Sequence, residues 1–204
     1  MSRYTGPVTR ISRRLGVMLF SNGQSKKKAY EKKPFKPGMH GQKHVGQFSE
    51  FNKQLREKQK ARAIYGITEK QSRKYYQMAT KKEGATGVVY MSLLESRLDN
   101  VIYRSGIAQT RPQARQLVCH GLVLLNNKRV NTPSILVNEH DEFEIRQRSK
   151  NIKIFDEAKA SKARAPKWIE IDMKNLKGKV LKAPGKEDIE HIIENQMITE
   201  FYSK

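Results

Sequence analysis

The chain has 204 residues and only one cysteine, Cys119, and it lacks any long run of apolar residues. One cysteine excludes an intramolecular disulfide framework and any zinc site that needs several thiolates. Without an apolar run of about 18 residues there is no candidate transmembrane helix. The N-terminus also lacks the continuous apolar stretch of a secretory signal. A reducing, cytoplasmic location is therefore expected.

Acidic residues are scarce as well. The chain has 20 Asp and Glu against 41 Lys and Arg, which gives a formal net charge of +21. A single-sign excess of this size opposes the compact state unless a polyanion neutralises it. Nucleic acid is the first candidate partner and an anionic membrane surface is the second. Almost half of the excess lies in residues 1–48, which hold 11 basic residues and one acid, Glu31.

Residues 21–42 are rich in Lys, Gly and Pro and contain few apolar residues. Two interpretations of this segment remain open at this point. Its composition is typical of a disordered basic tail. Alternatively, it is an arm that becomes ordered on RNA, which Tyr30, Phe35 and His40 favour because aromatic faces stack on bases.

Capping signals predict two helices after the arm. The first begins after Ser49 and ends at about Tyr65, with Gly66 as its stop. Phe51 lies on its expected apolar side, but polar residues interrupt that side, so the helix needs another source of stability such as a polyanion. TEKQ (68–71) is a capping box that opens the second helix.

Two further helices are predicted in the middle of the chain. One carries Leu94 and Leu98 on its apolar face and continues to Ser105. The other opens at the capping box TRPQ (110–113), with a proline in its first turn. It ends at Gly121, because glycine suits the left-handed conformation that terminates many helices.

Short strands follow the last of these helices. Residues 122–125 read as a strand, and an Asn-Asn pair then forms a tight turn into a return strand. Residues 133–137 and 142–148 are predicted as further strands. Residues 92–148 therefore form a compact α+β unit of two short helices and three or four strands.

Cys119 stands beside His120, a pairing that can indicate a metal ligand or a nucleophile. There is no second cysteine, and no acid follows at the spacing of a catalytic triad. Cys119 is therefore interpreted as a small, partly buried filler. His120 precedes the stop at Gly121, where a cationic side chain favours a helix C-terminus. No catalytic residue is predicted.

Residues 94–137 resemble the RNA-binding module first described in the fourth protein of the small ribosomal subunit. That module also occurs in RNA pseudouridine synthases, tyrosyl-tRNA synthetases and a small heat-shock RNA binder. Motifs on both sides extend the resemblance to the bacterial-type small-subunit ribosomal protein four family. They are RYTGPV (3–8), PGMHGQ (37–42), QLREKQKARAIYG (54–66), EKQ (69–71), PKWIEID (166–172) and EFYSK (200–204).

The resemblance implies an α+β fold whose mostly helical first domain contains an inserted α+β module, two helices packed on a small antiparallel sheet. It places a basic N-terminal arm at 1–45, a helical domain at 46–91 plus 178–204, and an inserted domain at 92–177 containing the module at about 92–150. Ile189, Ile192, Ile193 and Met197 have helical spacing, which predicts a helix over 188–198 that packs on the helical domain.

The resemblance also implies a function. Members of this family are structural proteins rather than enzymes. They bind 16S rRNA in the cytoplasmic ribosome, nucleate assembly of the subunit body, contact ribosomal protein five, lie near the mRNA path and influence translational accuracy. A membrane partner and homo-oligomerisation are not expected. An RNA-modifying enzyme and a stress-type RNA binder with the same module are the alternatives.

Many relatives of this kind carry a zinc-binding cysteine cluster in the arm. Here Thr9 and Ser12 stand where the first cysteine pair is expected, so no thiolate is present to bind zinc. His40 and His44 are four residues apart but lack another soft ligand. The chain thus resembles the cysteine-free variant of the family, and neither a metal nor a cofactor is expected.

Basic and polar residues of the arm, the helices and the Asn-Asn turn are the candidate RNA contacts. Arg111 and Arg115 lie on one helix face, and changing both to Glu is expected to weaken rRNA binding with little change in thermal unfolding. Glu95 and Asp99 are interpreted as local ion-pair or cap partners rather than catalytic acids. The candidates are Arg3, Arg10, Arg13, Arg14, Lys26, Lys36, His40, Gln42, Lys43, Lys53, Arg56, Lys60, Arg62, Arg73, Arg97, Arg111, Gln113, Arg115, Gln116, His120, Lys128 and Arg129.

Overall fold

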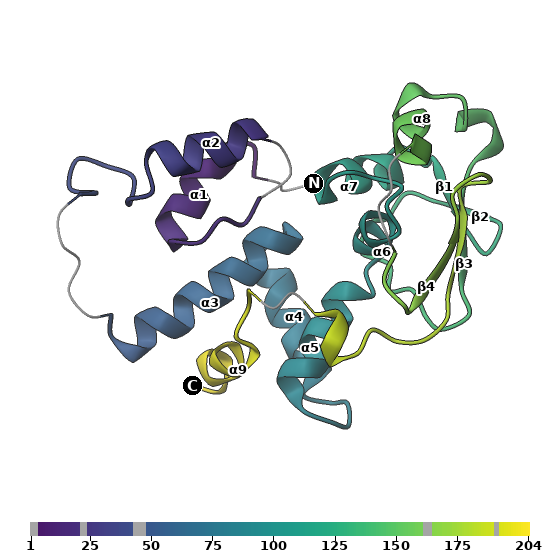
Figure 1. The fold of residues 1–204 in the computed structure, drawn as a ribbon. Helices are drawn as coiled ribbons and strands as arrows, with labels where there is room; N and C mark the ends of the chain where they lie inside the picture. Colours follow the sequence, from purple (N-terminus) through teal and green to yellow (C-terminus); the bar gives the residue numbers. More distant parts are fainter. Residues whose placement is uncertain (1–3, 21–23, 43–47, 161–164, 190–191) are drawn as a thin grey trace. The chain divides into compact units, whose positions relative to one another are not determined.

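A computed structural model describes residues 4–20, 24–42, 48–160, 165–189 and 192–204 (Figure 1). The chain forms two compact units, one from Met1–Gly87 with Glu190–Lys204 and the other from Val88–Ile189. The predicted α+β class is confirmed, since the first unit is helical in its described parts and the second combines helices with an antiparallel sheet.

The arm of the first unit contains two helices, α1 (Val8–Leu15) and α2 (Gln24–Lys32). α1 ends at Gly16, whose φ of 73° is the left-handed conformation expected at a helix stop. Arg13 Nε donates to the carbonyl of Phe35 at 2.9 Å, and its guanidinium lies 5.2 Å from the centre of the Phe35 ring. This side chain therefore ties α1 to the segment that follows α2.

The two predicted caps after the arm are confirmed. α3 (Glu50–Tyr65) begins after Ser49, whose hydroxyl accepts the N–H of Asn52 at 3.3 Å, and it ends at a left-handed Gly66. α4 (Glu69–Ala79) begins after Thr68, which accepts the N–H of Gln71. Both helices start where a side-chain oxygen satisfies a free backbone donor.

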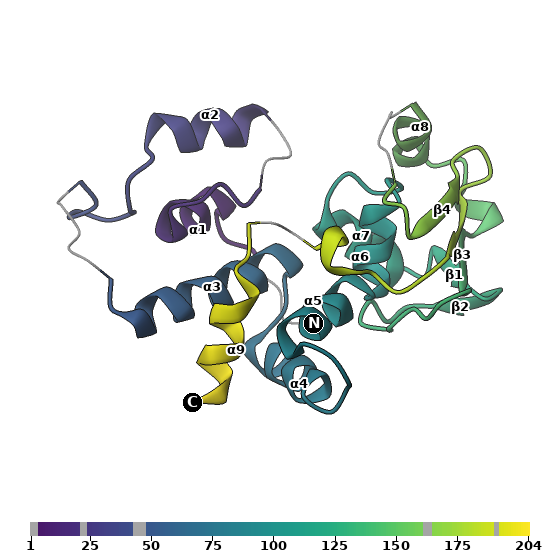
Figure 2. The same ribbon diagram turned by 60° about the horizontal axis from the view of Figure 1, so that its bottom comes forward.

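The predicted apolar side of α3 is confirmed only in part, since Tyr65 is buried and Leu55 is half-buried. Phe51 is 54% exposed, whereas Gln54, Glu57 and Lys58 are buried. This polar face packs against α9 (Asn195–Ser203), which lies beside α3 in Figures 1 and 2. Glu200 of α9 bonds to Gln54, the N–H of Glu194 bonds to Glu57, and Glu69 of α4 pairs with Lys58. Partners from both α4 and the C-terminal segment therefore compensate for the burial of polar residues on α3.

The helix predicted over 188–198 is also corrected. A short 3₁₀ turn, η2 (Lys186–Asp188), precedes it, and α9 starts only at Asn195. Residues 190–191 of the prediction lie outside the described residues. Of the four predicted apolar positions, Ile189 and Ile193 are buried and Met197 is half-buried, but Ile192 is 42% exposed. The spacing therefore marked inward-facing positions only in part.

The second unit begins within α5 (Thr86–Glu95), and α6 (Leu98–Arg104) follows, where one helix was predicted. The helix is interrupted at Ser96-Arg97 because this pair bonds to another segment. Leu98 N–H donates to the Ile135 carbonyl at 2.9 Å, and Val137 N–H donates to the Ser96 carbonyl at 2.8 Å. α7 (Arg111–Cys119) follows and packs on α6.

Five antiparallel strands form the sheet in the order β2-β1-β3-β5-β4. The predicted Asn-Asn turn is confirmed, since Asn126 and Asn127 have φ of 49° and 63° and pair two neighbouring strands as a hairpin. The described strands are β1 (Val123–Leu125), β2 (Lys128–Val130), β3 (Glu142–Ile145), β4 (Ile169–Asp172) and β5 (Lys177–Val180).

Two of the predicted strands need correction. Residues 133–137 contribute only an isolated bridge between Leu136 and Arg97. The strand predicted over 142–148 stops at Ile145, and a 3₁₀ turn, η1 (Gln147–Ser149), and then α8 (Lys153–Ala160) follow. β4 and β5 were not predicted. β5 crosses the predicted domain boundary at 177/178 and pairs only within the second unit, whose last residue is Ile189.

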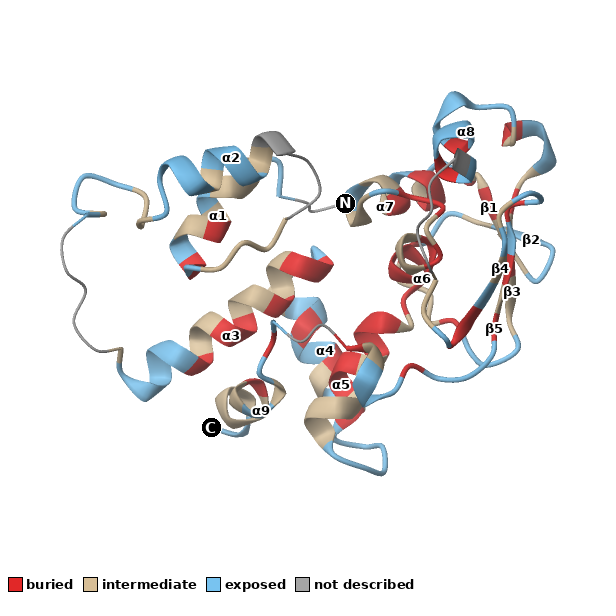
Figure 3. Cartoon of the chain, in the orientation of Figure 1, coloured by how far each residue is buried: buried red, intermediate tan, exposed pale blue. Residues whose placement is uncertain are grey.

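The second unit has an apolar core between the helices and the sheet. Leu98, Val118, Phe143, Phe155 and Trp168 are at most 1% exposed and belong to one cluster. Figure 3 shows buried positions in α6, α7 and the strands. Each fully buried side chain of this size contributes about 1.5–3 kcal/mol, so the core holds α6 and α7 firmly on the sheet.

Candidate nucleic-acid interface

The first turn of α7 is fixed by side chains. Thr110 accepts the backbone N–H of Gln113 at 3.3 Å, which confirms the predicted cap. The side-chain oxygen of Gln113 accepts the N–H of Gln109 at 2.8 Å. Arg111 and Arg115 therefore start from a helix end whose geometry is set by local hydrogen bonds and by the α6 contact.

Asp99 joins two predicted arginines in an ion-pair cluster. Arg97 donates to Asp99 from Nε at 3.0 Å and from Nη2 at 2.8 Å. Arg115 donates to the same carboxylate from Nε at 2.8 Å and from Nη2 at 2.6 Å. The interpretation of Asp99 as an ion-pair partner is confirmed. This residue, 3% exposed, holds Arg115 in one orientation.

Arg97 is removed from the candidate RNA contacts. It is only 2% exposed, and its guanidinium faces the Asp99 carboxylate. It turns inward because it occupies the break between α5 and α6, where its backbone is extended and bridges Leu136. An arginine buried to this degree has a structural role, since burying a charge requires a partner of opposite sign.

Glu95 organises a second cluster. Arg104 donates to it from Nε at 2.9 Å and from Nη2 at 2.7 Å, and Asn100 Nδ2 donates at 2.5 Å. Asn100 Oδ1 then accepts from Arg111 Nε at 2.8 Å, and the Arg111 guanidinium lies 4.4 Å from the centre of the Tyr103 ring. The interpretation of Glu95 as an ion-pair partner is confirmed, and Arg111 is held by a hydrogen bond and a cation–π contact.

These contacts contradict one expectation about Arg111 and Arg115. The Arg115 side chain is 16% exposed and is paired with Asp99. A glutamate at position 115 would place a second carboxylate against Asp99 and leave Arg97 to balance two acids. Changing both arginines to Glu would therefore lower the unfolding temperature as well as affect RNA, so that variant cannot separate the two effects.

The hairpin and the end of α7 present a second group of polar side chains. Lys128, Arg129, Gln116 and His120 are exposed. A Cβ atom added to Gly121, whose φ is +66°, would lie 2.5 Å from Arg129 Nε. The Arg129 side chain thus crosses the C-terminal end of α7, where a cation is favoured by the helix dipole. Among the described residues, Lys128 and Arg129 form no ion pair with an acid.

Cys119 is half-buried at the end of α7. Burial raises the pKa of its thiol, and the nearby Arg115 only partly offsets that rise. A thiol with a raised pKa holds little of the thiolate form that attacks electrophiles or binds metals. The structure therefore agrees with the interpretation of Cys119 as a packing residue.

The candidate RNA contacts of the first unit differ in exposure and in whether an acid already pairs with them. Arg3 and Lys43 lie outside the described residues. Lys53 pairs with Glu50, Lys60 pairs with Glu57, and Arg62 pairs with Glu69. Arg13, Lys26, Lys36 and Arg56 are half-buried, and the exposed candidates are Arg10, Arg14, His40, Gln42 and Arg73.

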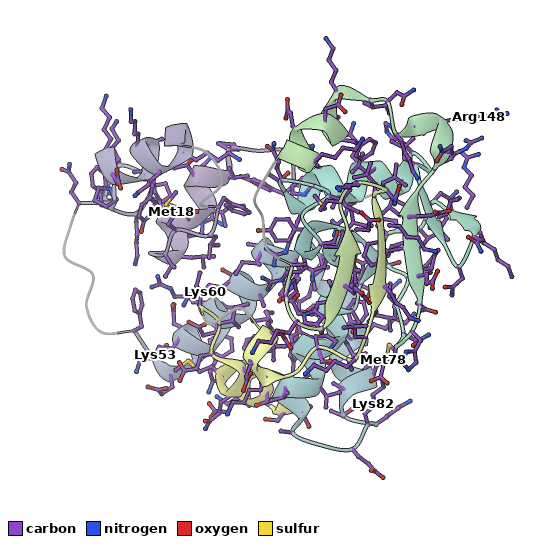
Figure 4. The ribbon with its side chains drawn as sticks, turned by 45° about the vertical axis from the view of Figure 1, so that its right-hand side comes forward. Met18, Lys53, Lys60, Met78, Lys82 and Arg148 are labelled. Carbon is purple, nitrogen blue, oxygen red and sulfur yellow. The ribbon has the colours of Figure 1, made fainter. Side chains whose placement is uncertain are left out.

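A further basic segment was missed. Arg148 and Lys153 are exposed, Arg146 and Lys150 are half-buried, and together they follow β3 in a short run. Figure 4 shows Arg148 projecting at the edge of the unit. The residues RQRSKNIK (146–153) carry four basic groups, and this run of charge in the sequence could have indicated a further RNA contact. Assigning part of it to a strand obscured the signal.

No group of three or more His, Cys, Asp or Glu side chains is arranged to hold a metal ion in the described ranges. Within the same ranges, no helix is long and apolar enough to cross a membrane.

The α6–α7 pair, the small sheet and the exposed cations have the features of an RNA-binding module. Residues 96–143 match the S4 domain family, and residues 3–95 match the family described as ribosomal protein S4/S9 N-terminal domain. Over its full length the chain is similar to the small ribosomal subunit protein uS4 of Thermus thermophilus and of Chlorobium limicola, each 46% identical with 100% of both chains covered. The uS4 protein of Natranaerobius thermophilus is 45% identical with the same coverage. The chain belongs to the uS4 family of small-subunit ribosomal proteins, which confirms the predicted resemblance.

Proposed function

We propose that this protein is a structural constituent of the small ribosomal subunit that binds 16S rRNA directly. The observation that carries this proposal is similarity to uS4 proteins over 100% of the chain. The net charge of +21 gives a physical reason, since rRNA supplies the polyanion that such a charge needs. The protein is not an enzyme.

The second unit binds RNA through cations that are held in place before contact. Arg111 and Arg115 are positioned by Asn100 and Asp99, and Lys128 and Arg129 extend the charged surface along the hairpin. Contacts of Lys and Arg with phosphates supply most of the affinity, and the shape of the folded RNA supplies the register. Because the arginines are already ordered, less side-chain entropy is lost on binding.

The proposal extends to assembly. Binding rRNA early, nucleating the subunit body and supporting translational accuracy follow from the family resemblance. Contacts with ribosomal protein five and with mRNA near its path into the ribosome rest on the same resemblance, as does a protein that is not a homo-oligomer. The location is the small subunit in the cytoplasm.

The two alternatives are not favoured. An RNA-modifying enzyme or a stress-type RNA binder would share the module, but here the similarity to uS4 also covers the flanking unit, residues 3–95 included. The half-buried Cys119, with its raised pKa, is a poor nucleophile. Asp99 and Glu95, the buried acids of the module, are occupied by arginines.

The cysteine-free character of the arm is also part of the proposal. Ser12, which stands at an expected cysteine position, is buried, and its hydroxyl accepts the N–H of Leu19 at 3.3 Å. Arg13 bonds to the Phe35 carbonyl, and Arg56 Nη2 donates to the Leu15 carbonyl at 2.6 Å. These residues offer no thiolate ligand for zinc. Hydrogen bonds from arginines to backbone carbonyls hold the arm together instead of a metal ion.

Reconstitution tests the proposed function. Purified protein is mixed with 16S rRNA or with large-subunit rRNA, and the complexes are sedimented after a wash at moderate salt. We expect stoichiometric recovery with 16S rRNA and much less with the large-subunit RNA. Equal recovery with both RNAs would show non-specific charge binding and would overturn the proposal.

A further inference from the structure

A groove lies between the arm and α3 in the first unit. Its volume is about 320 Å³, at the small end of the range of roughly 300–1,000 Å³ found for ligand pockets. Four cationic side chains line it, Arg10, Arg14, Lys36 and Arg56, and none of the described lining residues is acidic. Four like charges around one space repel each other, so the groove favours an anion.

The groove also has an apolar wall. Phe48 and Leu55 contribute to it, and the Phe48 ring has the Arg56 guanidinium 4.3 Å and the Lys36 ammonium 4.6 Å from its centre. Arg56 is anchored further by its bond to the Leu15 carbonyl. Cation–π contacts thus hold two of the cations beside a ring instead of letting them extend into solvent.

Two amides complete the lining, Asn52 and Gln59 on α3. An amide side chain offers both donors and an acceptor, which matches the edge of a nucleobase. The groove therefore offers cations that can bind a phosphate. Its apolar wall and the Arg56 guanidinium can pack against a flat ring, and its amides can bond to polar atoms of that ring. Its size suits one nucleotide and excludes a duplex.

We propose that this groove binds one unpaired nucleotide of an RNA strand, with its phosphate among Arg10, Arg14 and Lys36 and its base against Phe48 and Leu55. The inference rests on the proposed function, because RNA binding is what brings a strand to the arm. It adds a recognition mode that the exposed hairpin of the second unit cannot supply. There, Lys128 and Arg129 are exposed, and the proposed function has them meet phosphates at an open surface.

The test measures binding of fluorescein-labelled hexauridylate to the full chain by anisotropy, over a series of salt concentrations. Phe48→Leu removes the ring and keeps the charge, and it is expected to weaken binding about fivefold or more. Arg10→Ala with Arg14→Ala is expected to lower the log–log salt slope by about 0.7–1.4. A matched removal of two charges, Lys81→Ala with Lys82→Ala in the exposed loop after α4, is expected to change neither.

Two further probes separate the possible occupants. A duplex RNA of about twelve base pairs is expected to bind Phe48→Leu as well as it binds the unmodified protein, and hexaglutamate is expected to bind at least about tenfold more weakly than hexauridylate. The proposal would be overturned if Phe48→Leu weakened duplex binding as much as hexauridylate binding, or if hexaglutamate bound as tightly as hexauridylate. It would also be overturned if all variants bound hexauridylate with the same affinity. If 16S rRNA binding persists in that last case, only the groove assignment fails. If the unmodified protein does not bind 16S rRNA, the proposed function fails.

Discussion

The two units of this chain have equal length but reach stability by different means. The first unit holds 22 Lys and Arg against 8 acids, and the second holds 19 against 12. The second is built on an apolar cluster, whereas the α3–α9 contact of the first buries Gln54, Glu57 and Lys58. The second unit buries charged residues too, but its Glu95, Arg97 and Asp99 are each paired with an opposite charge, so the clearest difference between the units is net charge. The unit with the larger cationic excess gains more from a polyanion, so we expect the first unit to depend more on RNA than the second.

The largest effect is expected in the apolar core. Phe143→Ala removes a ring that is 0% exposed and packs against Gly178. We expect a decrease of about 3–5 kcal/mol in the free energy of unfolding, from reduced burial and the cavity left behind. Urea unfolding measures it, and a decrease below about 1 kcal/mol would mean that the second unit does not rely on this core.

Asp99→Ala leaves Arg97 buried without its partner. We expect the free energy of unfolding to decrease by up to about 5 kcal/mol. Arg115 loses its anchor in the same variant, so RNA affinity falls as well. The matched control is Asp156→Ala, since that side chain is 66% exposed and its removal should change stability by at most about 0.5 kcal/mol. Equal effects of the two variants would show that the buried cluster is unimportant.

A smaller effect is expected in the polar interface of the first unit. Lys58 bonds to Glu69 at 3.1 Å and lies 4.0 Å from the centre of the Phe201 ring. Lys58→Ala is expected to cost about 1–3 kcal/mol, because Glu69 and the ring lose a buried partner. Lys70→Ala on the exposed side of α4 is the control. Hydrogen exchange of α9 amides should rise in the first variant only; unchanged exchange would contradict a stabilising polar contact between α3 and α9.

The smallest effect concerns an exposed pair on the sheet. The hydrogen bond and charge of Lys177, 2.8 Å away, lower the pKa of Glu142. The Glu142–Lys177 pair therefore contributes to stability above the pKa that the Glu142 carboxyl has in the unfolded chain. That contribution is lost as pH falls through the lower pKa of the folded state. In Lys177→Met, NMR titration should show the Glu142 carboxyl titrating at higher pH. The same titration in both proteins would exclude the pair.

Local signals in the sequence predicted local structure well. The caps at Ser49, Thr68 and Thr110 and the turn at Asn126-Asn127 were identified correctly, because each depends on residues within one turn of the chain. The RNA-binding module was identified for the same reason, since its helices, stop and hairpin follow each other directly. The class of fold and the family could thus be predicted.

Non-local partners explain what could not be predicted. Gln54 is buried because Glu200 and Lys204, far along the chain, bond to it at 2.9 Å each. The sequence around Arg97 does not distinguish it from an exposed arginine. In the fold, the break before α6 directs its side chain toward Asp99. The break itself requires residues 135–137 to bond with 96–98. No window of the sequence shows such pairings.

The central claim is that exposed cations of this chain bind rRNA phosphates while buried cations hold the fold. Filter binding of 16S rRNA across a salt series tests it most directly, with the unmodified protein and with Lys128→Ala plus Arg129→Ala. The double variant should lower the slope of log affinity against log salt by about 1.4–1.8, because two phosphates are no longer neutralised, and its unfolding should be unchanged. An unchanged slope, or affinity that ignores salt in the unmodified protein, would contradict the claim.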